Sequence, residues 1–183
     1  MLYRYSFDSP LGCVRFEVED GHLTGLHFDP DPSVRYADDT DLLRQTQQQL
    51  TEYFAGSRTS FSIPLKLQGT DFQKRVWKVL QTIPYAKTMS YGQVAALAGN
   101  PKACRAVGMA NNRNPVAIIV PCHRVIGANG GMVGYGGGLW VKEKLLSLEQ
   151  DVLNRTQEGY NKNPVLCLVC ERDFFDIQTL CII

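Results

Sequence analysis

Residues 118–127 read Ile118-Ile119-Val120-Pro121-Cys122-His123-Arg124-Val125-Ile126-Gly127. The apolar run before Pro121 predicts a short buried strand, and the glycine-rich stretch at 127–138 predicts a loop that is neither helix nor strand. A cysteine between a buried segment and a flexible loop, with an imidazole beside it, is suited to be a thiolate nucleophile. The alternative is that Cys122 is a buried apolar side chain, as most free cysteines are.

The composition is that of an ordinary globular protein. A length of 183 residues suits one domain or two small ones, and 44% apolar residues rule out wholesale disorder. The net charge of +1 argues against a protein that coats nucleic acid through bulk positive charge. Basic residues do gather between 102 and 124, where they form either a local basic face or an ordinary solvated surface.

The sequence predicts an intracellular protein. Its apolar stretches are much shorter than a membrane span, and the first residues lack the apolar core of a signal peptide. We therefore expect no membrane partner and a cytoplasmic location, or a nuclear one in a eukaryote. The six cysteines are scattered, so we expect free thiols rather than disulfides.

The first 60 residues predict a small β-sheet domain with one helix. Apolar residues alternate with polar ones at 3–7 and 14–18, and a third strand is expected at 23–28. Helical spacing of apolar residues predicts a helix over 41–54. Residues 61–69 are expected to link this domain to the next, with one strand between Phe61 and Leu67.

Residues 70–150 predict a helical domain. Thr70-Asp71-Phe72-Gln73 and Ser90-Tyr91-Gly92-Gln93 are capping boxes that start two helices, and the first helix should end at Pro84. Asn100-Pro101 should cap a third helix, over 102–111.

The second and third of these helices form a helix-turn-helix pattern. The third carries small residues, which allow close approach either to a protein core or to DNA. A last helix is expected over 140–149. Residues 151–183 form an extension of unassigned role, with one strand over 164–170.

Five segments taken together resemble a known family. They are Ser90-Tyr91-Gly92-Gln93-Val94-Ala95, Arg105-Ala106-Val107-Gly108, Asn114-Pro115, Val120-Pro121-Cys122-His123-Arg124-Val125-Ile126-Gly127 and Lys142-Glu143-x-Leu145-Leu146-x-x-Glu149. In order and spacing they are similar to the O6-alkylguanine-DNA alkyltransferases, also called methylated-DNA–protein-cysteine methyltransferases. The resemblance covers about residues 1–150. It implies an α/β (α+β) fold, in which a ribonuclease-H-like β-sheet with a helix precedes a helical domain that holds the helix-turn-helix and the reactive cysteine loop.

The resemblance also implies direct-reversal DNA repair. The alkyl group of O6-alkylguanine, and of O4-alkylthymine, would pass irreversibly to Cys122 in a single turnover that needs no cofactor. His123 would take the thiol proton through a water, and Glu149 would orient the imidazole. Tyr91 would give its phenolic hydrogen to the departing guanine, and Asn114 would brace the active-site turn.

The implied partner is double-stranded DNA that carries the lesion, bound through its minor groove by a monomer. The target base must be flipped out of the duplex, and Arg105 would fill the vacated stack. The other DNA contacts are expected from Ala103, Cys104, Ala106, Gly108 and Arg124. The substrate pocket is assigned to Val125, Tyr135, Gly136 and Gly137.

Three other functions fit the sequence less well. A lesion-binding protein without repair activity is disfavoured, because relatives of that kind carry tryptophan in place of Cys122. A thiol enzyme on small substrates leaves the helix-turn-helix unexplained, and a regulator of this family would add a zinc-thiolate domain.

No structural metal is expected. Cys13, His22 and His27 do not have the spacing of a tetrahedral zinc site. Cys167-x-x-Cys170, with Cys181, is more in keeping with ordinary packing or partial disorder than with a metal or redox site.

Overall fold

The structure is a computed structural model that describes residues 1–28 and 36–162. Met1–Glu149 forms one compact unit, and the residues from Gln150 onward belong to a second. The strand expected at 164–170 and the cysteines at 167, 170 and 181 lie outside the described residues.

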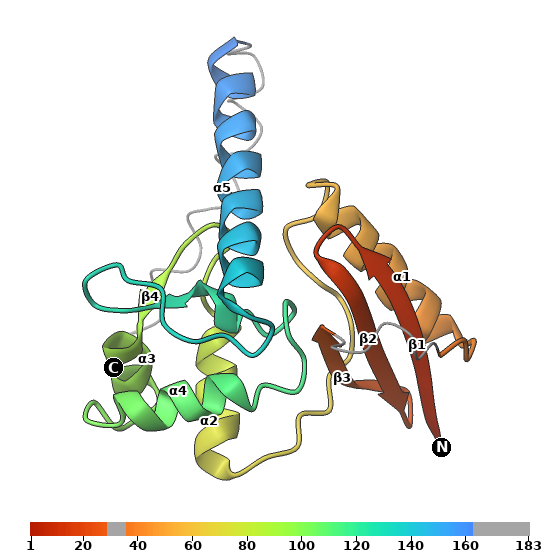
Figure 1. Cartoon of the computed structure of the whole chain (residues 1–183), viewed down its shortest axis with the longest axis horizontal. Coiled ribbons are helices and arrows are strands. Elements are labelled where there is room, and N and C mark those ends of the chain that lie inside the picture. The colour runs from red at the N-terminus through yellow and green to blue at the C-terminus, as the bar shows by residue number, and fades with distance from the viewer. Residues whose placement is uncertain (29–35, 163–183) are drawn as a thin grey trace, which may run out of the picture. The chain divides into compact units, whose positions relative to one another are not determined.

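An antiparallel sheet forms at the N-terminus in the order β1-β2-β3, from Leu2–Ser9, Gly12–Glu19 and His22–Phe28. The alternation of apolar and polar residues confirms the three predicted strands, because Val14, Phe16 and Val18 all point into the core. Helix α1 (Asp41–Phe54) packs against β1 and β2 (Figure 1) and begins at the predicted residue.

The strand expected between Phe61 and Leu67 is wrong. Only Leu65 forms a β-bridge, to Leu23 of β3, through hydrogen bonds from Leu23 N to Pro64 O at 2.8 Å and from Lys66 N to Leu23 O at 3.1 Å. Proline has no backbone N–H, so this segment cannot continue a regular ladder.

Both predicted capping boxes are present, at the start of α2 (Asp71–Leu80) and of α3 (Tyr91–Leu97). Helix α2 ends at Leu80 rather than at Pro84. Proline disfavours helical dihedrals in the residue before it, and the chain leaves α2 through a tight turn in which Ile83 N donates to Leu80 O at 3.1 Å.

Helix α4 (Cys104–Asn112) begins two residues later than predicted. Asn100 Oδ1 accepts from Lys102 N at 3.3 Å, but residues 101–102 form only a turn, and Asn100 also closes the end of α3. Gly99 adopts a left-handed φ of 87°, and Asn100 N donates to Ala95 O at 2.9 Å. This is the Schellman pattern that closes a helix C-terminus. Helices α3 and α4 pack together as the predicted helix-turn-helix.

The apolar run at Ile118–Val120 is buried as predicted, but it is a turn and not a strand. Ile118 and Val120 are buried, and Ile118 has a φ of 69°, which is rare for a β-branched residue and ends any strand there. The 127–138 loop contains neither helix nor strand, as expected.

A two-stranded parallel sheet, absent from the prediction, follows this turn. Strand β5 (Val125–Ile126) pairs with β4 (Met89–Ser90) directly before α3. Two-residue strands leave no periodic signal in a sequence. Their pairing ties the start of α3 to η1, the 3₁₀ turn at Cys122–Arg124.

Helix α5 (Leu139–Lys162) is longer than the predicted 140–149. Val141 and Leu145 point into the core, and so do Lys142 and Glu149. In the described part of the chain, no helix is both long enough and apolar enough to cross a membrane.

Gly69 lies just before α2, where there is no room for a side chain. A Cβ on Gly69 would lie 2.6 Å from the ring of Trp77 and 2.8 Å from Gln73 Oε1. We expect Gly69→Ala to lower the free energy of unfolding by about 1 to 3 kcal/mol, as overpacking does. Urea unfolding followed by tryptophan fluorescence measures the change.

Gly92→Ala is the matched control. Its Cβ would meet only Ser90 Oγ, at 3.9 Å, and alanine favours a helix more than glycine does. Equal free energies of unfolding for the two variants would contradict the crowding at Gly69.

Candidate active site

The thiol of Cys122 lies at the start of η1 and is only 5% exposed. Its Sγ accepts a hydrogen bond from Asn114 Nδ2 at 3.1 Å. Burial raises the pKa of the Cys122 thiol, although the Asn114 hydrogen bond and the charge of Lys142 oppose this shift. Cys122 is therefore a protonated thiol near neutral pH, and it needs a base before it can act as a nucleophile.

Asn114 holds the turn that carries Cys122. Its Nδ2 also donates to Val120 O at 2.7 Å, and its Oδ1 accepts from Val116 N at 3.1 Å. The bond to Val120 O spans the left-handed Ile118, and strained backbone of this kind persists only where its surroundings determine it strongly. Asn114 thus contacts both the turn and the sulfur.

His123 and Glu149 form a fully buried pair, with 2.9 Å between His123 Nε2 and Glu149 Oε1. Burial alone would raise the pKa of Glu149, but His123 and Arg124 outweigh it and lower this pKa to about 2. The carboxylate is therefore ionised and can only accept, so the proton of the neutral imidazole is on Nε2.

The second ring nitrogen of His123 is an acceptor. Nδ1 is buried and has no hydrogen-bond partner among the described residues. Burial lowers the pKa of His123 despite the opposing effect of Glu149. At neutral pH the ring is an uncharged base whose Nδ1 is available for a proton.

Glu149 also accepts hydrogen bonds from groups that the sequence did not reveal. Tyr53 Oη donates to Oε1 at 2.8 Å, and the Ala86 backbone N–H donates to Oε2 at 2.9 Å. Tyr53 is 96 positions away in the chain, so no spacing signal could have linked it to Glu149.

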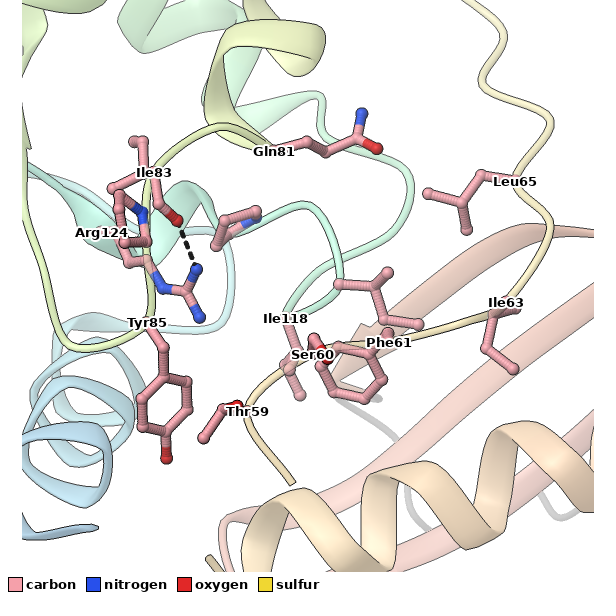
Figure 2. A pocket seen from close by; sticks show the side chains of 13 residues that line it. Thr59, Ser60, Phe61, Ile63, Leu65, Gln81, Ile83, Tyr85, Ile118 and Arg124 are labelled. Carbon is pink, nitrogen blue, oxygen red and sulfur yellow. Dashed lines mark hydrogen bonds between the residues drawn. The ribbon is translucent and has the colours of Figure 1, made fainter. Parts of the chain in front are cut away.

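Arg124 was expected to contact DNA, and this is wrong. Its Nη2 donates to Glu149 Oε1 at 2.9 Å and its Nε to Oε2 at 3.0 Å, while Nη1 donates to Ile83 O at 2.7 Å. Figure 2 shows the guanidinium beside Ile83 at the wall of a cavity of about 470 Å³. A buried carboxylate needs a counter-charge, and Arg124 supplies it at 7% exposure.

Lys142 is a further residue that sequence reasoning missed. It is fully buried, and its Nζ donates to Val125 O at 2.6 Å and to Val133 O at 3.1 Å. Its positive charge lowers the pKa of Cys122. Lys142, Leu145 and Glu149 are spaced by three and four residues, so one helix face holds all three, and this spacing was a usable signal.

Tyr91 begins α3, where the pairing of β4 with β5 positions it. It is half-buried, and its hydroxyl donates to Val133 O at 3.1 Å. Burial raises the pKa of Tyr91. The phenol is therefore protonated and able to donate.

A cavity of about 170 Å³ opens at Cys122. The residues that line it are His27, Phe28, Asn111, Asn112, Asn114, Ala117, Cys122, Tyr135, Gly136 and Gly137. Three of the four residues predicted for the substrate pocket are among them. Val125 is not, because its side chain is buried in the core at β5.

Helix α4 presents the other predicted DNA contacts. Cys104 and Arg105 are exposed, while Ala103, Ala106 and Gly108 are partly exposed. A third cavity, of about 320 Å³, is lined by Tyr91, Cys104, Arg105, Gly108, Asn112, Val133 and Gly134. The exposed side of α4 is thus next to Tyr91, and Asn112 lines both this cavity and the one at Cys122. Among the described residues, no group of three or more His, Cys, Asp or Glu side chains could hold a metal ion.

Comparison with known proteins identifies two family domains. Residues 1–67 match the ribonuclease-like domain of 6-O-methylguanine DNA methyltransferase, and residues 71–151 match its DNA binding domain. The methylated-DNA–protein-cysteine methyltransferase of Methanosarcina mazei is 54% identical over 157 residues, which cover 83% of this chain and 99% of the relative. The one from Mycobacterium tuberculosis is 47% identical over 162 residues, which cover 82% of this chain and 93% of the relative.

Solved structures agree with this match. The O6-methylguanine methyltransferase of Mycobacterium tuberculosis aligns with a TM-score of 0.75 at 48% identity, over 82% of this chain and 94% of that one. A structure of the same organism's OGT in complex with DNA aligns with a TM-score of 0.76 at the same identity and coverage. The expected fold class is confirmed, and the chain belongs to the 6-O-methylguanine DNA methyltransferase family.

Proposed function

We propose that this protein repairs DNA directly, by transferring the alkyl group from the O6 atom of a guanine to Sγ of Cys122. The observation that carries the proposal is a buried thiol at a cavity, held by Asn114 and followed in the chain by a neutral His123 paired with ionised Glu149. The names of the relatives, methylated-DNA–protein-cysteine methyltransferases, support it.

The reaction begins with removal of the thiol proton. His123 takes this proton on Nδ1 through a water, and the ionised Glu149 stabilises the imidazolium that results. The positive charge of Lys142 stabilises the thiolate. Proton removal must come before the attack on the alkyl group, because burial holds Cys122 in its thiol form.

The alkyl transfer is an in-line displacement. The thiolate attacks the alkyl carbon and forms a C–S bond, and the C–O6 bond breaks with its electron pair passing to the guanine. Tyr91 gives its phenolic hydrogen to the guanine ring as negative charge develops there. The thioether is stable, so each molecule reacts once.

The protein binds double-stranded DNA, with the alkylated base flipped out of the base stack. The DNA complex of the Mycobacterium tuberculosis OGT supports DNA as the partner. Exposed Arg105 on α4 fills the vacated space, and the small residues of α4 lie against the minor groove. The protein acts as a monomer inside the cell, in the compartment that holds the DNA, and it accepts O4-alkylthymine as well.

Each molecule of the protein should accept one alkyl group. After incubation with duplex DNA that carries one O6-methylguanine, intact mass and peptide mapping should find one added methyl group per molecule, on the Cys122 peptide. Cys122→Ser should gain none. Cys104→Ser, which removes an exposed cysteine, should still gain one methyl group. Tight DNA binding without a change in mass would instead support a lesion sensor.

The pH dependence of the rate follows from the lowered pKa of His123. An unperturbed imidazole is half protonated at pH 6.5 and has then lost half of its capacity as a base. Because the folded-state pKa is below that value, the single-turnover rate at pH 6.5 should be more than half of its plateau value near pH 7.5, and should fall at lower pH. Circular dichroism over the same range must report a folded protein. A rate at pH 6.5 that is half of the plateau would contradict the prediction.

Gly136 should influence which alkyl groups are accepted. It lines the Cys122 cavity, and a Cβ there would meet only Asn112 O, at 4.0 Å. Gly136→Ser should therefore fold and narrow the cavity, lowering the benzyl-to-methyl ratio of transfer rates by roughly tenfold. Gly136→Ala separates the effect of size from that of the hydroxyl group. Unchanged relative rates on O6-methylguanine and O6-benzylguanine would contradict this prediction.

A further inference from the structure

Tyr53, at the C-terminal end of α1, donates its phenolic hydrogen to the carboxylate that orients His123. The distance from Tyr53 Oη to Glu149 Oε1 is 2.8 Å, and His123 Nε2 binds the same oxygen at 2.9 Å. Tyr53 and Glu149 are both completely buried. A buried phenol needs a hydrogen-bond partner, and the one that Tyr53 uses belongs to the active site.

Aromatic packing holds the Tyr53 ring in place. Its centroid lies 5.5 Å from that of Phe54, 5.4 Å from that of Phe61 and 6.1 Å from that of Tyr85. The hydroxyl therefore approaches Glu149 from a fixed direction. Burial, together with the charge of Glu149, raises the pKa of Tyr53 well above its usual value, so the hydroxyl carries a hydrogen at every pH at which the protein works.

We propose that Tyr53 is a positioning residue for alkyl transfer, through which the ribonuclease-like domain acts on the reaction. The proposal rests on the proposed function, because it assigns Tyr53 a part in preparing His123 as the base. Tyr53 lies within the segment that matches the ribonuclease-like domain, residues 1–67, whereas His123 and Glu149 lie within the DNA binding domain match, residues 71–151. The active site thus draws on both domains.

The hydroxyl acts by limiting the negative charge that Glu149 offers to His123. A hydrogen-bond donor on Oε1 withdraws electron density from the oxygen that accepts from the imidazole. Without that donor, the carboxylate binds the imidazolium form more strongly, and the pKa of His123 rises. The carboxylate also loses one of the contacts that fix its orientation, and misplaced catalytic groups slow a reaction.

Arg124, Lys142 and Tyr85 are charged or titratable groups close to His123 and Glu149. Arg124 and Lys142 each lower the pKa of His123, and Arg124 donates to both carboxylate oxygens. The Tyr85 ring contacts the ring of Tyr53. The guanidinium of Arg124 lies over the Tyr85 ring, with Cζ 5.6 Å from the ring centroid. None of these groups is altered when the Tyr53 hydroxyl alone is removed.

The test compares Tyr53→Phe with Tyr85→Phe. Both substitutions remove one hydroxyl from the same aromatic cluster and keep the ring, and thus the packing. The first readout is the single-turnover rate of methyl transfer from O6-methylguanine DNA, measured well below the melting temperature of each variant. The second is the pKa of His123 from an NMR titration of its imidazole, in a chain that contains only three histidines.

We expect Tyr53→Phe to slow transfer about tenfold, which corresponds to one hydrogen bond of ordinary strength. We also expect it to raise the pKa of His123, so that the acid limb of the rate profile moves to higher pH. Tyr85→Phe should leave both readouts unchanged. Wild-type values for Tyr53→Phe, or an equal slowing of both variants without a change in the His123 pKa, would overturn the proposal.

The two readouts separate this inference from the proposed function. If the wild-type protein transferred no methyl group to Cys122, the proposed function would fail. The NMR titration would still decide whether Tyr53 sets the pKa of His123, because it needs neither DNA nor alkyl transfer. An unchanged pKa in Tyr53→Phe would then overturn the inference as well.

Discussion

The structure depends on the buried negative charge of Glu149. A carboxylate removed from water is costly unless charge and hydrogen bonds compensate for it. Here the compensation comes from His123 and Arg124 in η1, Tyr53 at the end of α1 and the backbone of Ala86. Segments far apart in the sequence are thereby brought to one point, beside the reactive thiol. The same contacts that make the burial of Glu149 tolerable also prepare His123 as a base.

A second set of contacts controls the shape of the chain at Cys122. Asn114 spans the turn around Ile118 and reaches the sulfur, and β4 pairs with β5 so that Tyr91 starts its helix close by. Lys142 binds the carbonyl of Val125 and brings positive charge toward Cys122. Asn114 and Lys142 both donate side-chain hydrogen bonds to backbone carbonyls. Such bonds stabilise an irregular segment whose backbone groups are not paired in a helix or a sheet.

Local patterns in the sequence predicted much of the fold, and their failures have local causes. The capping boxes at Thr70 and Ser90 were recognisable because both partners of each box are three residues apart. Asn100 carried an equally good helix-start signal, and its Oδ1 does accept from Lys102 N at 3.3 Å, but only a turn follows it and α4 begins at Cys104. The apolar residues at Ile118 and Val120 indicated burial correctly, yet burial does not distinguish a strand from a tight turn.

The sequence by itself determined the three N-terminal strands, the starts of α1, α2 and α3 and, through the resemblance, the candidates Cys122, His123 and Glu149. These depend on periodicity, caps and short motifs, which are properties of neighbouring residues. Only the tertiary structure decided that Arg124 turns inward to Glu149, that Lys142 is buried, and that Tyr53 reaches the active site from α1. The physical reason is that the partner of a buried polar group is selected by proximity in space and by the cost of leaving its charge uncompensated. Neither is recorded in the spacing of residues along the chain.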